Sequence, residues 1–207
     1  MNAVVMLDFD GVIADSLGPF FAGFVAACRR HGLDALADLD RFLALFDGNL
    51  YAGLEAAGCP RERLPALLGT LGEELAIRAP DAPFFPGMAE TVSKLAREWP
   101  VFVITSNVSA VVRDCLARNG VAGVREVLGA DVDPGKVSKI RRVMGLFPGA
   151  VGYYVGDTRG DMIEGRAGGA RTVAVTWGWH RRARLAPAVP DYWADQPPDL
   201  LKLFAAS

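Results

Sequence analysis

The sequence has few of the residues that build disulfide frameworks and zinc sites. It contains three cysteines, Cys28, Cys59 and Cys115, an odd number spread over 207 residues. Its two histidines, His31 and His180, lie far apart and lack the spacing of a metal-binding pair. A disulfide scaffold is therefore excluded, and any metal would have to be held by other side chains.

Long apolar runs and an excess of one charge are also absent. No apolar run approaches the roughly 20 residues that a membrane-spanning helix needs. The formal net charge is −2, which argues against a general nucleic-acid binder. The chain begins with an apolar segment and has no basic leader. We therefore expect a cytoplasmic protein that binds neither membranes nor nucleic acid.

The chain does contain short apolar segments that alternate with longer helical patterns. The expected strands are residues 3–9, 101–105, 126–128, 152–155 and 172–176, and the expected helices between the later strands are residues 88–98, 109–119, 137–145 and 161–168. Strands without polar alternation are typical of a parallel sheet that is buried on both faces. The pattern predicts an α/β fold, a Rossmann-like doubly wound parallel sheet with the strand order 3-2-1-4-5.

The connection between the first two expected strands differs from the others. It has no convincing strand, and its apolar residues recur with helical spacing in two stripes, one within residues 20–28 and one within 64–75. The segment is too long for a simple crossover. We expect residues 16–84 to form a helical cap domain, and residues 1–15 and 85–207 to form the catalytic core.

Polar residues follow the expected strands at their carboxyl ends. They are Asp8 and Asp10 after the first strand, Thr105, Ser106 and Asn107 after the second, Lys136 after the third, and Asp157 and Asp161 after the fourth. In an open α/β sheet, ligands bind in the crevice beyond the carboxyl ends of the strands. The sequence therefore predicts that these groups converge on a binding site.

The grouped carboxylates limit the chemistry of this site. Four of them would repel one another by several kcal/mol in a partly desolvated site, so a cation is needed. Because all the candidate ligands are oxygens, Mg²⁺ is the natural cation. If the pKa of Asp8 stays near its ordinary value of about 4, its carboxylate can attack phosphorus without an activating base. Asp10 could protonate the leaving oxygen and later take a proton from water.

The same residues carry a resemblance to a known family. The chain resembles the haloacid dehalogenase-like (HAD) hydrolase superfamily, in its phosphoglycolate phosphatase-like branch with a helical cap. Its family motifs are Asp8-Phe9-Asp10-Gly11 with the following Asp15-Ser16, Ile104-Thr105-Ser106-Asn107, and Gly156-Asp157 with Asp161; further matches are Phe85-Pro86-Gly87 and Val175-Thr176-Trp177-Gly178. The resemblance covers nearly the whole chain.

The resemblance implies a role for each motif residue. Asp8 would be the nucleophile and Asp10 the acid and base. Asp8, the backbone carbonyl of Asp10, and Asp157 would hold Mg²⁺, with Asp161 helping directly or through water. Thr105 would bind phosphate together with the backbone of the two residues after it, Ser106 and Asn107.

Three further assignments depend on local sequence. The third family motif often reads Lys-Pro-x-Pro, whereas this chain has Lys136 at the expected helix start and Lys139 one turn later. We choose Lys136 as the lysine that bridges Asp8 and phosphate, and Lys139 stays open. Gly11 is placed with the phosphate-binding residues, although its simplest role is the tight backbone turn beside the nucleophile. Asn49 lies in a segment that resembles a cap loop reaching into the site, although an ordinary loop is an equal alternative.

These assignments predict a Mg²⁺-dependent phosphatase acting on a small phosphorylated metabolite, with phosphoglycolate as the best single guess, in a monomer or homodimer. Asp10 argues against a dehalogenase, which needs no acid there. A phosphonate hydrolase would need a lysine in the cap, and residues 16–84 contain none. A sugar-phosphate mutase or a pyrophosphatase of the same fold is an alternative. A nonenzymatic phosphate-binding module is an alternative of another class.

Overall fold

The computed structural model describes residues 3–78, 82–133 and 135–205. The chain divides into two compact units, one made of Met1–Asp15 and Pro83–Ser207 and the other of Ser16–Ala82. The expected helical insert, residues 16–84, differs from the second unit only where it ends. Each unit is described by itself below.

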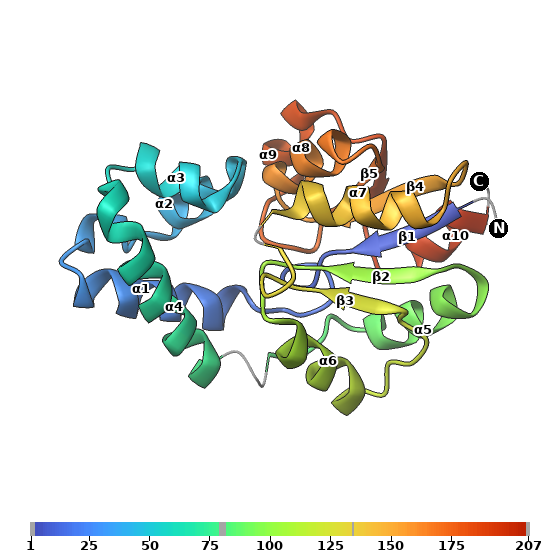
Figure 1. Cartoon of the computed structure of the whole chain (residues 1–207), viewed down its shortest axis with the longest axis horizontal. Helices are drawn as coiled ribbons and strands as arrows, with labels where there is room; N and C mark the ends of the chain where they lie inside the picture. The colour runs from blue at the N-terminus through green and yellow to red at the C-terminus, as the bar shows by residue number, and fades with distance from the viewer. Residues whose placement is uncertain (1–2, 79–81, 134, 206–207) are drawn as a thin grey trace. The chain divides into compact units, whose positions relative to one another are not determined.

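The first unit is built on one parallel sheet of six strands in the order β3-β2-β1-β4-β5-β6 (Figure 1). The strands are β1 (Ala3–Leu7), β2 (Val101–Ile104), β3 (Glu126–Leu128), β4 (Val151–Gly156), β5 (Arg171–Val175) and β6 (Tyr192–Ala194). The α/β fold and the predicted order of the first five strands are confirmed.

The sixth strand was not predicted. β6 has three residues and, within the described residues, pairs with β5 alone, for example through Trp193 opposite Ala174. Tyr192 and Trp193 are half-buried, so the segment lacks the continuous apolar run that marks the inner strands. A strand this short depends on pairing with a neighbour that is distant in sequence, which the sequence pattern does not show.

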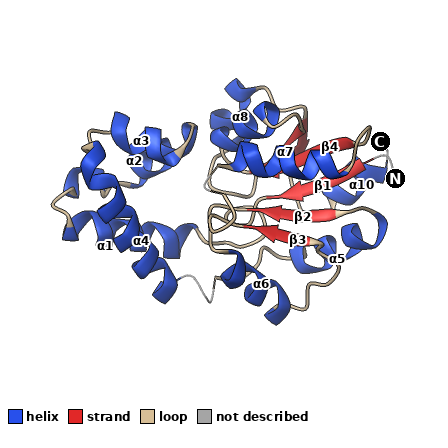
Figure 2. Ribbon diagram, viewed as in Figure 1, coloured by secondary structure: helices blue, strands red, loops and turns tan. Residues whose placement is uncertain are grey.

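Helices cover both faces of the sheet (Figures 1 and 2). α5 (Met88–Glu98) and α6 (Ser109–Arg118) lie on one face, and α7 (Lys136–Leu146) and α8 (Arg159–Ala167) lie on the other. The chain continues after β5 through α9 (Arg182–Leu185), the 3₁₀ turn η4 (Ala186–Ala188) and α10 (Asp199–Ala205). No helix that the structure describes has both the length and the apolar character needed to cross a bilayer.

The core of this unit follows from the alternation of side chains along its strands. On the α7 face, Val4 and Met6 of β1 pack in one buried cluster with Tyr154 of β4 and Ile140 of α7. On the opposite face, the ring of Tyr153 lies 4.9 Å from that of Phe204. Burial on both faces explains why the strands read as uninterrupted apolar runs in the sequence.

Every secondary-structure element of the second unit, within its described residues, is an α-helix or a 3₁₀ helix. Its elements are α1 (Leu17–Arg30), η1 (Asp34–Leu36), α2 (Leu39–Ala44), η2 (Leu45–Asp47), α3 (Leu50–Ala56), η3 (Arg61–Arg63) and α4 (Leu64–Arg78). α1 packs against α4. Phe42 is fully buried, and its ring lies 5.0 to 5.9 Å from those of Phe20, Phe21, Phe24 and Phe46. Both predicted apolar stripes contribute buried residues to this core, among them Phe24 and Leu67, and Phe42 and Leu54 from the segment between the stripes complete it.

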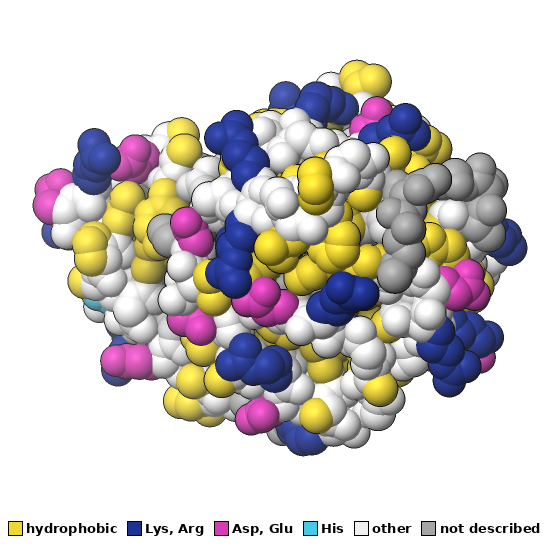
Figure 3. Space-filling view, turned by 45° about the vertical axis from the view of Figure 1, so that its right-hand side comes forward, with side chains coloured by type: hydrophobic (Ala, Val, Ile, Leu, Met, Phe, Trp, Pro, Cys, Tyr) yellow, Lys and Arg dark blue, Asp and Glu magenta, His cyan; other side chains and the backbone are white. Residues whose placement is uncertain are grey.

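Charged side chains on the face drawn in Figure 3 are mixed. Lysine and arginine side chains alternate there with acidic, hydrophobic and neutral ones. A nucleic-acid-binding domain more often gathers its basic side chains into one patch or stripe. The basic side chains on the face drawn do not gather into such a patch.

Candidate active site

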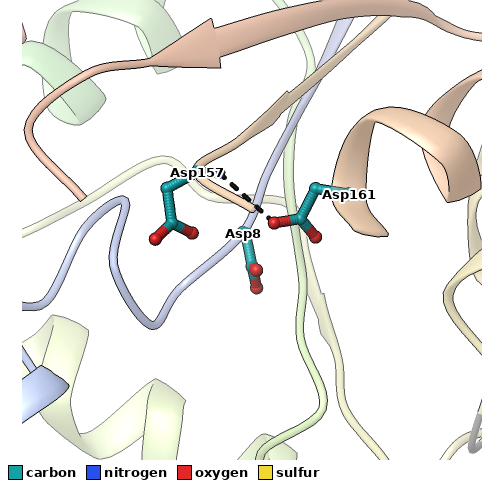
Figure 4. Close-up of side chains that lie close together, drawn as sticks. All are labelled: Asp8, Asp157 and Asp161. Carbon is teal, nitrogen blue, oxygen red and sulfur yellow. Dashed lines mark hydrogen bonds between the residues drawn. The ribbon is translucent and has the colours of Figure 1, made fainter. Parts of the chain in front are cut away.

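Three buried aspartates meet at the carboxyl edge of the sheet. Asp8 follows β1, Asp157 follows β4, and Asp161 lies in the first turn of α8 (Figure 4). One carboxylate oxygen from each lies within 4.8 Å of the others. β1 and β4 are neighbours in the sheet, so their ends bring the acids together. The predicted convergence of these three residues is therefore present in the structure.

A lysine lies in the same cluster. Nζ of Lys136, the first residue of α7, donates to Oδ2 of Asp8 at 2.6 Å and to Oδ1 of Asp161 at 2.7 Å. Nζ of Lys139 donates instead to the backbone oxygens of Thr105 (2.7 Å) and Gly129 (3.3 Å). Of the two candidate lysines, Lys136 therefore contacts the carboxylates, whereas Lys139 ties together the ends of β2 and β3.

The side chain of Asp161 is fixed from several directions. Its Oδ2 accepts from the backbone N–H and the hydroxyl of Thr158, and the Thr158 hydroxyl accepts from the Asp161 N–H, which makes a capping box at the start of α8. Its Oδ1 accepts from Lys136 and from the Tyr154 hydroxyl, the latter at 3.2 Å. Asp161 is therefore the least available of the three acids for direct contact with a cation.

One carboxylate oxygen of Asp157 accepts a hydrogen bond from the described residues, and the other does not. Its Oδ2 accepts from the Trp179 N–H at 2.7 Å. Its Oδ1 is buried and has no hydrogen-bond partner within the described ranges of the chain. An unpaired buried carboxylate oxygen is costly, and a cation bound there would remove the cost. This orphaned oxygen fits a hard metal ion held by oxygen ligands.

Burial and crowding shift the pKa of each group in the cluster. Burial raises the pKa of Asp8 to about 7, although Lys136 opposes the shift. Burial, with Asp161 and Asp8 nearby, raises the pKa of Asp157 well above its ordinary range. Burial would also raise the pKa of Asp161, but Lys136 and Thr158 lower it overall. Burial would lower the pKa of Lys136, but Asp161 and Asp8 raise it well above its ordinary value.

These shifts correct one expectation. The pKa of Asp8 does not stay near its ordinary value, because the carboxyl is buried and shares the site with other acids. Lys136 alone does not compensate for that burial. Additional positive charge would stabilise the ionised form of Asp8 and lower its pKa, as a bound metal ion does.

The loop after β2 supplies possible donors to an anion. The hydroxyl oxygen of buried Thr105 accepts from the Asn107 N–H at 3.0 Å, which leaves the Thr105 hydroxyl proton free to be donated. The Ser106 N–H makes no hydrogen bond with the part of the chain that the structure describes. The Asn107 N–H, which we expected to bind phosphate, is turned toward Thr105 instead. The side-chain Nδ2 of Asn107 donates to Oδ2 of Asp10 at 3.5 Å.

Two other predicted residues have local structural roles. Gly11 has φ of 78°, its N–H donates to the Ala14 oxygen, and a Cβ at this position would clash with the Asp157 carboxylate. It therefore provides the tight turn and the space for Asp157, and its own N–H is already used. Asn49 belongs to the helical unit, where its side chain accepts from the Tyr51 N–H and caps α3. The contact of Asn49 with a substrate stays a prediction.

Besides Thr158, sequence reasoning missed two groups that act on the acids. The Tyr154 hydroxyl contacts Asp161, but in the sequence Tyr154 reads as one more apolar strand residue. A tyrosine within a fully buried strand was the available signal, because a buried hydroxyl needs a partner. The second group is the Trp179 N–H on Asp157, a backbone donor that no side-chain pattern reveals.

Comparison with known proteins places the chain in a family. The sequence model of the haloacid dehalogenase-like hydrolases matches residues 5–175, a span that includes all the acids described above. The chain belongs to the haloacid dehalogenase-like hydrolases. The expected family and the expected hydrolytic class are therefore confirmed.

Relatives of this hydrolase match over most of their length. It is 30% identical to a phosphoglycolate phosphatase from Synechococcus elongatus, over 98% of this chain and 96% of the relative. It is 25% identical to phosphoglycolate phosphatase 1 from Pseudomonas aeruginosa, over 96% and 78%. A haloacid dehalogenase-like family hydrolase from Streptococcus pneumoniae shares the fold, with a TM-score of 0.82 at 20% identity over 99% and 98%. The family and these relatives together support a phosphoric monoester hydrolase.

Proposed function

We propose that this hydrolase cleaves a small phosphomonoester through a covalent phosphate ester on Asp8. The observation that carries the proposal is the contact of Lys136 with Asp8, beside the unpaired Oδ1 of Asp157. An attacking carboxylate, a cation on that carboxylate and an open oxygen for a metal ion are the parts that phosphoryl transfer needs.

The acids support Mg²⁺ as the cofactor. Asp8, Asp157 and the backbone carbonyl of Asp10 would hold the ion, with Asp161 beside them. All these donors are oxygens, which suits a hard cation of this kind. When bound, Mg²⁺ would supply positive charge that draws the phosphate group to the site and stabilises charge on its oxygens.

The chain's own groups account for the bonds that form and break. The Asp8 carboxylate attacks phosphorus, the bond from phosphorus to the leaving oxygen breaks, and Asp10 donates a proton to that oxygen. Asp10 then takes a proton from a water molecule, which attacks the phosphorus bound to Asp8. Phosphate leaves, and Asp8 and Asp10 return to their starting states.

Two further groups would bind the phosphate oxygens. The Thr105 hydroxyl and the Ser106 N–H follow β2, which is the neighbour of β1 in the sheet. Lys136 would contact phosphate from the side of α7 while it stays bonded to Asp8. Asn107 would act through Asp10, since its amide approaches the Asp10 carboxylate.

Phosphoglycolate is the substrate that the comparisons favour. Two relatives that match over most of this chain carry the name phosphoglycolate phosphatase. The expected partner is accordingly a small phosphorylated metabolite. The cytoplasmic location and the monomeric or homodimeric state stay predictions.

A phosphatase panel tests the proposal. The purified protein is assayed with phosphoglycolate, sugar phosphates, nucleotides, pyrophosphate and p-nitrophenyl phosphate, with Mg²⁺ or with EDTA. We expect Mg²⁺-dependent release of phosphate, highest with phosphoglycolate, and no turnover by Asp8→Asn. Normal turnover by that variant would contradict the nucleophile assignment. Isomerised sugar phosphate without net release would indicate a mutase, and inactivity on every compound would favour a binding module.

A further inference from the structure

The loop after β5 lies directly against Asp157. The Trp179 N–H donates to Oδ2 of Asp157 at 2.7 Å, and the His180 N–H donates to the Asp157 backbone oxygen at 3.3 Å. The His180 ring also accepts from the Arg159 N–H at 3.0 Å, two residues beyond Asp157. Residues 176–180 therefore hold both the side chain and the backbone of one acid of the cluster.

Gly178 is the point where this loop comes closest to the acid. A Cβ on Gly178 would lie 2.5 Å from both Oδ2 of Asp157 and the backbone oxygen of Gly11, and closer still to the Asp157 Cβ. The φ angle of Gly178 is not in the left-handed region, so a left-handed backbone is not what requires glycine here. The need for glycine here is therefore one of space.

Gly11 limits Asp157 from a second side. A Cβ on Gly11 would also meet the Asp157 carboxylate. The carboxylate is thus confined between two glycines, Gly11 in the loop after β1 and Gly178 in the loop after β5. This confinement fixes Oδ2 on the Trp179 N–H and leaves Oδ1 without a partner.

We propose that Gly178 is a positioning residue that sets the metal affinity of the site, because it lets residues 176–180 hold Asp157 with Oδ1 free for a cation. This inference rests on the proposed function, in which Asp157 is a metal ligand. Groups that orient a metal ligand are often as important for affinity as the ligand itself. Gly178 does not touch the reacting atoms, so its effect passes through Asp157.

Alanine at position 178 would weaken metal binding more than it would slow the chemical step. The added methyl group must push away either the Asp157 side chain or the loop, and both movements weaken the bond from the Trp179 N–H. The methyl group would also meet the Gly11 backbone oxygen, but no atom of Asp8 or Asp10 is among the three nearest to it. The apparent affinity for Mg²⁺ would therefore fall, whereas kcat at saturating Mg²⁺ would change little.

The main experiment measures metal binding without turnover. Mn²⁺ is titrated into the wild type, Gly178→Ala and Gly145→Ala at 25 °C without substrate, and free Mn²⁺ is followed by electron paramagnetic resonance. Gly145 is the matched control, since it is exposed on α7 and a Cβ there would meet nothing within 4 Å. We expect binding by Gly178→Ala to be about 10- to 100-fold weaker. The control should bind as the wild type does.

The outcomes separate this inference from the proposed function. Equal Mn²⁺ affinity in Gly178→Ala and the wild type, with binding lost in Asp157→Asn, would overturn the positioning role and leave the proposed function intact. A wild type that binds no Mn²⁺ would overturn both. A loss of kcat at saturating Mg²⁺ with unchanged Mn²⁺ affinity would also overturn the positioning role.

A second measurement needs no variant. Hydrogen exchange of residues 176–180 is compared in the wild type with EDTA and with Mg²⁺ at about ten times its dissociation constant. Because the ion fixes Asp157, exchange of the Trp179 amide should slow by about tenfold. Exchange in α10, far along the chain, should not change. Equal exchange of the Trp179 amide in both conditions would overturn the proposal even if Gly178→Ala did not fold.

Discussion

The ammonium group of Lys136 donates to Oδ2 of Asp8 at 2.6 Å, although 128 residues separate the two in the chain. The same group donates to Oδ1 of Asp161 at 2.7 Å. One buried cation thus links the end of β1, the start of α7 and the first turn of α8. Because both carboxylates are buried, this lysine is the main positive charge that the chain itself places on them.

Replacement of Lys136 by methionine should abolish most of the activity. The same replacement of Lys139, one helical turn later, should not. Lys136→Met leaves Asp8 and Asp161 without their shared cation, so we expect kcat/KM to fall by about 10³-fold. Lys139→Met removes donors only from two backbone oxygens, and we expect kcat/KM to stay within about tenfold of the wild type. Steady-state kinetics at saturating Mg²⁺ measures both. The reverse order would identify Lys139 as the active-site lysine.

Lys139→Met should instead lower stability. Its ammonium group bonds the Thr105 and Gly129 oxygens at 2.7 and 3.3 Å, and without it these buried acceptors lose a partner. We expect the free energy of unfolding at pH 7 to fall by about 1 to 3 kcal/mol.

The stability difference between the wild type and Lys139→Met should also depend on pH. Burial lowers the pKa of Lys139 to about 8, so the cost of its buried charge shrinks as pH rises above 8. The wild type should therefore gain stability relative to Lys139→Met between pH 8 and 10 in denaturant titrations.

Stabilisation by Mg²⁺ should increase with pH. The pKa of Asp8 is about 7 in the folded protein, above its ordinary value, so without the ion the folded state binds more protons than the unfolded state. The stability due to that proton is fully present below pH 4 and is lost as pH rises through 7. Mg²⁺ competes with the proton, so its apparent affinity should rise by up to about tenfold per pH unit below 7. Thermal shifts at fixed Mg²⁺ from pH 5 to 8 measure this.

Asp8→Asn is the control for this pH dependence. The amide takes up no proton in this range, so the loss of stability with pH in EDTA should become smaller. An equally steep loss in the variant would show that another group of the cluster carries the proton.

The acids of the site could be predicted because each follows an apolar strand. Asp8 and Asp157 end two runs whose residues are buried on both faces, and the ends of neighbouring parallel strands must lie at one edge. Strand order alone brings these two acids together, whatever the orientation of their side chains. The same reasoning placed Thr105 at the end of β2.

The other features of the site depend on three-dimensional contacts that no short stretch of sequence reveals. Lys136 and Lys139 lie three residues apart on one helix, so the sequence left both open, and only the position of α7 on the sheet separates them. The direction of the Asn107 N–H is set by the turn after β2. The hydrogen bond from Trp179 to Asp157 uses the backbone and is independent of residue type.

Loss of the Tyr154 hydroxyl should weaken catalysis through Asp161 and Lys136. Its oxygen lies 3.2 Å from Oδ1 of Asp161, the atom that also accepts from Lys136. Tyr154→Phe frees that carboxylate to move, so we expect kcat/KM to fall by about three- to tenfold, the worth of one hydrogen bond of roughly 1 kcal/mol. Tyr153→Phe is the matched control, because Tyr153 is equally buried on the opposite face of the sheet, against Phe204. An equal loss in both variants would mean that packing in β4, and not the Tyr154 hydroxyl, supports the site.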